Sequence, residues 1–178
     1  NISFTESQKD TTDYLGRNED NLRWIAKKKY LSKNLKEIIS QIDTYMEKGE
    51  IIKDEEGHKI IRLKLNEEIF VIKKYQIKGS WHYLRKLFSQ TRALTAWKAS
   101  HWFNAAGIKT FNIVAVIEKY NFLTTTESYL ISLNQLEERL DLVDLNKQPE
   151  YLIENRLSSF FKRLEWIGFN HGDAKNAN

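Results

Sequence analysis

The stretch that decides the fold reads EIIKDEEGHKIIRLKLNEEIFVIKKYQ (residues 50–76). In residues 61–65 apolar and charged side chains alternate, which is the period of a β-strand with one buried face. The acidic segments DEEG (54–57) and NEE (66–68) stand where turns belong. Residues 69–75 are rich in β-branched and aromatic side chains. The sequence therefore predicts two or three antiparallel strands joined by short hairpins.

Helical patterns flank these strands on both sides. Before them, residues 21–48 carry apolar side chains mostly at three- and four-residue steps, and Gly49 ends the pattern. Residues 1–20 are polar and lack a period, so we expect a loosely held lead-in. After the strands, a long helical pattern runs over residues 81–106, and Gly107 is placed to end it as a C-terminal cap.

The rest of the chain predicts two more strands and then helices. The strands are FNIVAVIEKY (111–120) and FLTTTESYLIS (122–132). A helix is expected over residues 136–145, and another with one apolar face between Pro149 and Gly168. This order of elements predicts an α+β fold with a small antiparallel sheet and one inserted helix, and it excludes the alternating pattern of a doubly wound sheet.

Composition narrows the class of protein. With 178 residues, 41% apolar and 12% aromatic, the chain can bury a core. It has no cysteine, which excludes disulfides and thiolate metal sites. No apolar run approaches the roughly 20 residues of a membrane span, and no secretory signal is visible at the start, so we expect a cytoplasmic protein. The net charge of +4 favours anionic partners. Because the aromatic residues lie on apolar faces, we expect no nucleic-acid binding.

The chain ends on NHGDAKNAN (170–178), straight after an apolar helical pattern. Four of its residues occupy the defining places of the pattern H-x-D-x-K-x-x-N, the catalytic loop of protein-kinase-like enzymes: His171, Asp173, Lys175 and Asn178. The spacing suits phosphoryl transfer, because such an Asp accepts the proton of the attacking hydroxyl and such an Asn binds a metal beside the phosphates. The Lys can offset charge on the transferring group. A simple turn is the alternative interpretation of Asp173.

Together with this loop, several softer patterns make the chain resemble the lipopolysaccharide kinase family, which includes heptose kinases and 3-deoxy-manno-octulosonic acid kinases. The resemblance covers roughly residues 49–178. Gly172, where protein kinases usually carry Arg, is typical of kinases that act on sugars and small molecules. The softer patterns are represented here by Val71, Lys73, Lys74 and Tyr75, by Arg92, Ala93 and Trp97, by residues 106–110, and by Ser128, Tyr129 and Leu130.

The resemblance implies a protein-kinase-like fold. Residues 49–132 would form its N-terminal lobe, and residues 133–178 the start of its C-terminal lobe, ending in the catalytic loop. Residues 1–48 would form an N-terminal helical extension. It also implies an enzyme dependent on ATP and Mg²⁺ that phosphorylates a sugar hydroxyl of the lipopolysaccharide inner core, with peripheral contact to the inner face of the inner membrane.

The same resemblance assigns roles to individual residues. Asp173 and Lys175 would be catalytic, and Asn178 would bind the metal. A strand lysine would hold the nucleotide phosphates. Because neighbouring residues on a strand point to opposite faces, only one of Lys73 and Lys74 can do so. The V-x-K pattern favours Lys73.

Three departures from the family pattern keep alternatives open. Only Gly57 lies in the turn where kinases carry a glycine-rich loop. No Asp or Glu occurs between Glu68 and Glu118, so the inserted helix cannot supply the carboxylate that usually pairs with the strand lysine, and Glu118 is the remaining candidate. The second metal ligand would follow Asn178, so we expect these residues alone to be inactive. The alternatives are a kinase of another small molecule or of a protein, and a pseudokinase that binds without turnover.

Overall fold

The computed structural model describes residues 11–19, 21–76, 90–105, 107–108, 110–121 and 124–133, and, nearer the end, residues 155, 158–163 and 165. The chain divides into two compact units. One comprises residues 1–100 and 111–135, and the other comprises residues 101–110 and 136–178. The domain boundaries expected from the sequence, at residues 48 and 132, stay predictions.

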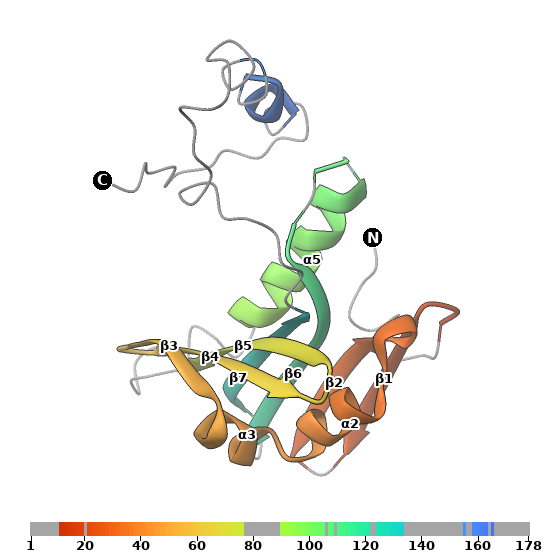
Figure 1. Ribbon diagram of the computed structural model, residues 1–178. Helices are drawn as coiled ribbons and strands as arrows, with labels where there is room; N and C mark the ends of the chain where they lie inside the picture. The colour runs from red at the N-terminus through yellow and green to blue at the C-terminus, as the bar shows by residue number, and fades with distance from the viewer. Residues whose placement is uncertain are drawn as a thin grey trace. The chain divides into compact units, whose positions relative to one another are not determined.

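The first unit is built on a seven-stranded sheet in the order β1-β2-β6-β7-β5-β4-β3, and every neighbouring pair is antiparallel (Figure 1). The strands are β1 (Tyr14–Glu19), β2 (Leu22–Lys27), β3 (Glu50–Glu55), β4 (His58–Leu65), β5 (Glu68–Gln76), β6 (Asn112–Asn121) and β7 (Thr124–Leu133). The predicted α+β class with an antiparallel sheet is confirmed, and the sheet is larger than expected.

The deciding stretch folds as its pattern indicates, into the consecutive hairpins β3–β4 and β4–β5. Gly57 lies in the first turn with φ +80°, and Asn66 lies in the second with φ 53°. Glycine and asparagine are the residues that adopt this left-handed conformation at least cost. The turn chemistry therefore fixes both hairpins locally.

Helix α5 (Arg92–Ala105) separates β5 from β6. Thr91 begins it, since the Thr91 hydroxyl accepts a hydrogen bond from the backbone N–H of Leu94. Gly107, with φ +72°, follows its end as predicted. The helix was expected to start near residue 81, and residues 77–89 lie outside the described part.

The expectation of helix throughout residues 21–48 is wrong at its start. Residues 22–27 form β2 and residues 28–30 form a single 3₁₀ turn, η1 (Lys28–Tyr30). Helices α2 (Lys33–Ser40) and α3 (Ile42–Lys48) account for the rest. The expected lead-in contains β1, which pairs with β2. Strand β2 escaped prediction because Trp24, Ile25 and Ala26 are all buried, so no alternation marks it as a strand.

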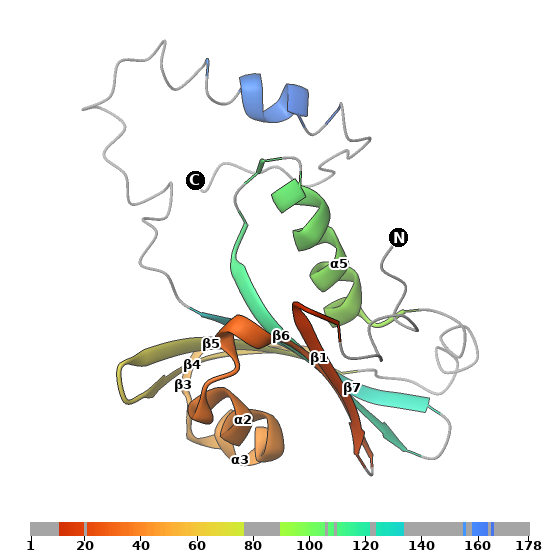
Figure 2. The same cartoon turned by 90° about the vertical axis from the view of Figure 1, so that its right-hand side faces the viewer.

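Each face of the sheet carries its own hydrophobic cluster. One cluster packs α2 and α3 onto the sheet, and we call this side the α2–α3 face; its members include Leu35, Ile38, Met46, Ile61, Phe70, Ile72, Ile117 and Tyr129. The other packs α5 onto the opposite side, the α5 face; its members are Ile25, Ala93, Leu94, Trp97, Ile113 and Val116. Figures 1 and 2 show the helices on opposite sides of the sheet.

Less of the second unit is described. Residues 155, 158–163 and 165 are helical, which agrees with the helix predicted after Pro149. The helix predicted over residues 136–145 and the loop at residues 170–178 lie outside the described residues. Within the described part of the chain, no helix has the length and apolar character needed to cross a membrane.

Candidate functional site

Lys73 lies in a row of residues that runs across the sheet on the α5 face. Its neighbour on β4 is Ile60, which pairs in turn with Lys53 on β3. On the other side its neighbour is Leu130 of β7, which packs against the cluster beneath α5. Residues that face one another in this way present their side chains on the same side of the sheet. Lys73 is half-buried there.

Lys74 lies on the α2–α3 face and is already engaged. Its Nζ lies 2.5 Å from a carboxylate oxygen of Glu127 and 5.5 Å from the centre of the Tyr129 ring. Burial raises the pKa of Glu127, but hydrogen bonds from Lys74 and Tyr129 outweigh it, so the net shift is downward. The two neighbouring lysines therefore differ in both face and partner. Choosing Lys73 as the nucleotide ligand remains a prediction.

No ion pair joins Lys73 to a carboxylate within the described ranges. Its Nζ lies 5.1 Å from the centre of the Tyr75 ring. Burial lowers the pKa of the Lys73 ammonium, and the nearby charges of Lys53 and Arg92 lower it further. This part of the α5 face therefore holds positive charge that an anion would stabilise.

Glu118 is not the partner of Lys73. Its carboxylate is buried and accepts hydrogen bonds from Arg23, the shortest at 2.7 Å, and from the Thr91 hydroxyl at 2.6 Å. The sheet register explains this, because Glu118 lies directly opposite Arg23, whereas Lys73 lies opposite Leu130. Glu118 thus links β2 to the start of α5.

The helix instead presents a cation on this side. Nη1 of Arg92, the first residue of α5, lies 2.9 Å from Nε2 of His58. Because arginine can only donate, His58 Nε2 accepts, and the ring proton lies on Nδ1. Burial lowers the pKa of His58, and the charges of Arg92 and Lys73 add to the shift, which favours the neutral ring. The His58 ring also contacts the edge of Tyr75, with centroids 5.4 Å apart.

Apolar side chains lie next to these basic groups. Ile60, which pairs with Lys73, and Val71, two residues before Lys73 on β5, are half-buried on the α5 face. Apolar side chains beside two cations suit a ligand that joins an aromatic ring to phosphates. Arg92 was visible in the sequence as part of a family pattern and as one member of a basic run that fits a phosphorylated glycolipid or a solvated helix face, and His58 was not singled out. The sequence feature that could have indicated His58 is its place directly after Gly57, the glycine of the turn.

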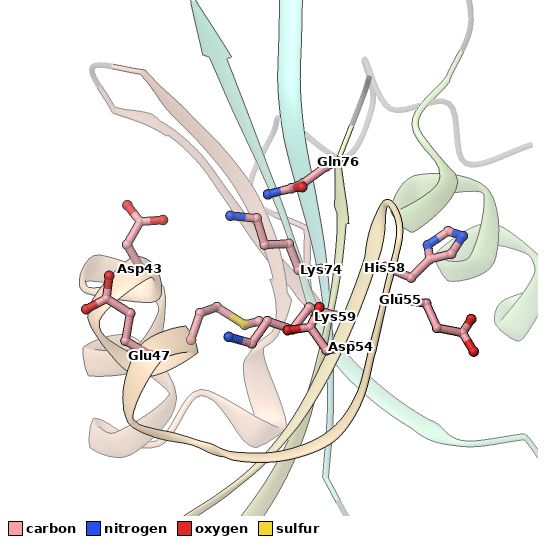
Figure 3. A pocket seen from close by; sticks show the side chains of 9 residues that line it. Asp43, Glu47, Asp54, Glu55, His58, Lys59, Lys74 and Gln76 are labelled. Atoms are coloured by element: carbon pink, nitrogen blue, oxygen red, sulfur yellow. The ribbon is translucent and has the colours of Figure 1, made fainter. Parts of the chain in front are cut away.

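A separate hollow of about 390 Å³ lies on the other side of the hairpin (Figure 3). Its lining residues are Asp43, Met46, Glu47, Asp54, Glu55, His58, Lys59, Lys74 and Gln76. In Figure 3 the His58 ring points toward α5, away from Lys74 and Asp43. The hollow thus contains Lys74 and mixed charges, and Lys73 is not among its lining residues.

The other predicted site residues, Asp173, Lys175 and Asn178, lie outside the described part of the chain. Among the described residues, no group of three or more His, Cys, Asp or Glu is arranged to hold a metal ion. Of the predicted site residues, Lys73 is therefore the one that lies in the described part of the chain.

Comparisons with known proteins add little to this description. No family model matches the chain, and no curated protein matches it. A solved structure described as "WaaP in complex with acyl carrier protein" is similar at 17% identity, with a TM-score of 0.48. The match covers 71% of this chain and 50% of that one, so the chain spans about half of its length. Similarity at this level does not indicate an activity for this chain.

Proposed function

We propose that this protein is an ATP-dependent kinase that uses Lys73 to bind the nucleotide phosphates. The observation that carries the proposal is the place of Lys73 on β5. This strand is the third of the run β3–β4–β5, is followed by α5, and presents the half-buried Lys73 on the α5 face. Protein kinases carry their nucleotide lysine on the third strand, ahead of a helix. The sequence pattern of residues 171–178 supports the same class.

The remaining chemistry is assigned from the sequence pattern. Asp173 orients the acceptor hydroxyl and takes its proton, Lys175 offsets charge on the transferring group, and Asn178 binds Mg²⁺. ATP supplies the phosphoryl group. The surroundings of Lys73 fit the nucleotide, since they combine the apolar side chains of Ile60 and Val71 with positive charge that is paired with no carboxylate of the described residues.

The acceptor we propose is a sugar hydroxyl of the lipopolysaccharide inner core. Its support is the family resemblance of residues 49–178, together with a net charge of +4 that suits an anionic glycolipid. Such an acceptor places the enzyme at the inner face of the inner membrane. Another small molecule, or a protein, is the alternative acceptor on the same fold.

A pseudokinase is the second candidate function, and a specific observation favours it. The carboxylate that normally pairs with the strand lysine is missing from α5, and Glu118, which could have replaced it, is bound to Arg23. Proteins that have lost this pair can retain nucleotide binding without turnover. Such a protein would bind ATP and transfer no phosphate.

The test uses the full-length protein and dephosphorylated lipopolysaccharide core. Nucleotide affinity and phosphoryl transfer are measured for the wild type, for Lys73→Ala, and for Lys74→Ala as the matched control on the opposite face. We expect Lys73→Ala to lower turnover by orders of magnitude, and Lys74→Ala to change it little. Binding without transfer would support the pseudokinase. Equal effects of the two substitutions would contradict the assignment of Lys73.

A further inference from the structure

We propose that Arg92, held in place by His58, is a second phosphate ligand beside Lys73. The inserted helix would then supply a cation to the nucleotide, whereas in kinases it supplies a carboxylate to the strand lysine. This inference rests on the proposed function, because it names a further binding residue of the same site. Lys73 and Arg92 would act as phosphate ligands, and His58 as a positioning residue.

Arg92 lies at the start of α5, beside the β3–β4 hairpin. Arg92 is the first residue of α5, and His58 is the first residue of β4, directly after Gly57. Their side chains meet at 2.9 Å. The hairpin turn lies where kinases place the loop that covers the nucleotide phosphates. The contact therefore fixes an arginine at the place where a phosphate chain would lie.

Arg92 has more hydrogen-bond donors than its contact with His58 uses. A guanidinium carries five N–H groups in a rigid fork, and one of them serves His58. Arg92 is exposed, so the remaining donors are accessible to a ligand. His58 is a neutral acceptor, so it orients the guanidinium without cancelling its charge. A planar fork that retains its charge matches two oxygens of a phosphate group.

The electrostatic field at Lys73 supports the same assignment. Arg92 is close enough to Lys73 for its charge to help lower the pKa of the Lys73 ammonium, after burial and the charge of Lys53. Lys53 also adds to this field, but Glu55 lies 2.9 Å from its Nζ and offsets part of its charge. No ion pair to a carboxylate is found for Lys73 or Arg92 in the described part of the chain. The positive end of the fourteen-residue helix α5 adds to the same side.

His58 also contains a hydrogen-bond donor without a partner among the described residues. With the proton on Nδ1, the His58 ring has a buried N–H for which no hydrogen-bond partner is found among the described residues. A buried donor without a partner is costly, and a phosphate oxygen or a water held by one would satisfy it. The cluster thus combines an unmet donor with positive charge that is paired with no carboxylate of the described residues, and a polyphosphate anion supplies the missing negative charge.

The test measures binding of ATP, AMP and inorganic tripolyphosphate to the full-length protein by calorimetry. Arg92→Ala should weaken ATP and tripolyphosphate about 10-fold to 100-fold and AMP much less, since one charged hydrogen-bonding group is lost from the distal phosphates. Arg92→Lys should recover part of the affinity. Lys98→Ala, on the same helix, is the matched control and should bind like the wild type.

His58 is tested by rescue. His58→Phe removes the acceptor and should weaken tripolyphosphate several-fold, whereas His58→Gln, which retains an acceptor oxygen, should restore most of the affinity. A residue that only packs against Tyr75 would give the opposite order, because Phe keeps the ring. The unfolding midpoints of all variants are measured alongside. Because Arg92 is exposed, its substitution should leave the unfolding midpoint unchanged.

The outcomes separate this inference from the proposed function. If Lys73→Ala loses ATP while Arg92→Ala binds it like the wild type, the kinase proposal stands and the role of Arg92 is overturned. If the wild type binds neither ATP nor tripolyphosphate, both fail. The last measurement is binding to vesicles that contain phosphorylated glycolipid. If Arg92→Ala loses vesicle binding but retains ATP binding, the arginine binds the phosphate of an acceptor. That result would overturn its assignment to the nucleotide.

Discussion

Replacing Glu118 by Gln tests how the sheet, its β1–β2 hairpin and α5 are held together. The Glu118 side chain is 2% exposed and accepts hydrogen bonds from Arg23 at 2.7 and 3.0 Å and from Thr91 at 2.6 Å. Gln preserves the size of the side chain and removes its charge. The ion pair between Arg23 and Glu118 is then lost, and one hydrogen bond at the start of α5 is weakened.

The size of the effect follows from burial. Removing one partner of a fully buried ion pair costs about 3–5 kcal/mol. The Arg23 side chain is 32% exposed, so water solvates part of its charge. We therefore expect Glu118→Gln to lower the free energy of unfolding by about 2–3 kcal/mol. At a urea dependence of about 1–3 kcal/mol/M, the midpoint should fall by about 0.7–3 M.

The assay is urea unfolding followed by tryptophan fluorescence, with an unchanged slope expected. Glu50→Gln is the matched control, because Glu50 pairs with Arg62 at 3.5 Å on the exposed edge, where such pairs contribute about 1 kcal/mol or less. The double variant Arg23→Met/Glu118→Leu should be less destabilised than the sum of its single changes. A Glu118→Gln protein with the wild-type midpoint would refute the reasoning.

Three further predictions concern packing, pH and catalysis. Gly49→Ala should destabilise the fold by about 1–3 kcal/mol, measured by denaturant titration, because its Cβ would lie 2.4 Å from the Ile61 side chain. Since the pKa of Glu127 is lowered in the folded state, its stabilising contribution is present above about pH 4.5 and is lost as pH falls through the lower folded value; Glu127→Gln should therefore lose less stability on acidification than the wild type, in unfolding midpoints compared across that range. Asp173→Asn should reduce turnover of the full-length protein by roughly 10² or more in steady-state kinetics while nucleotide affinity stays nearly constant, and wild-type turnover would contradict the catalytic interpretation.

The strands that sequence reasoning found are those whose signals are local. In β4 the alternation of buried and exposed residues is visible in the letters, and the turns at Gly57 and Asn66 use residues suited to left-handed backbone. Strand β2 has no such signal. It is buried on both faces, and its partner β6 lies far along the chain, since Arg23 and Glu118 are 95 positions apart. No local pattern reveals a pairing of that separation.

The same distinction applies to the candidate site. The alternation of side chains along β5 places Lys73 and Lys74 on opposite faces, which can be read from the sequence alone. The family pattern then indicates Lys73 as the nucleotide ligand. The contact between Arg92 and His58 joins residues 34 apart and depends on how the hairpin and the helix meet. The role of Glu118 depends on register, which places it opposite Arg23. Such facts follow from tertiary packing, which residue periodicity does not encode.

The position of β2 also has a consequence for how the protein is made. Strand β2 is complete at Lys27, yet it pairs with β6, which ends at Asn121. During translation, most of the first unit must therefore be synthesised before the β2 edge of the β1–β2 hairpin is covered by β6. An uncovered strand edge is a template for pairing with other chains. The nascent chain is thus most exposed to wrong partners in the interval before Asn121 leaves the ribosome, and closure of the sheet by β6 ends that interval.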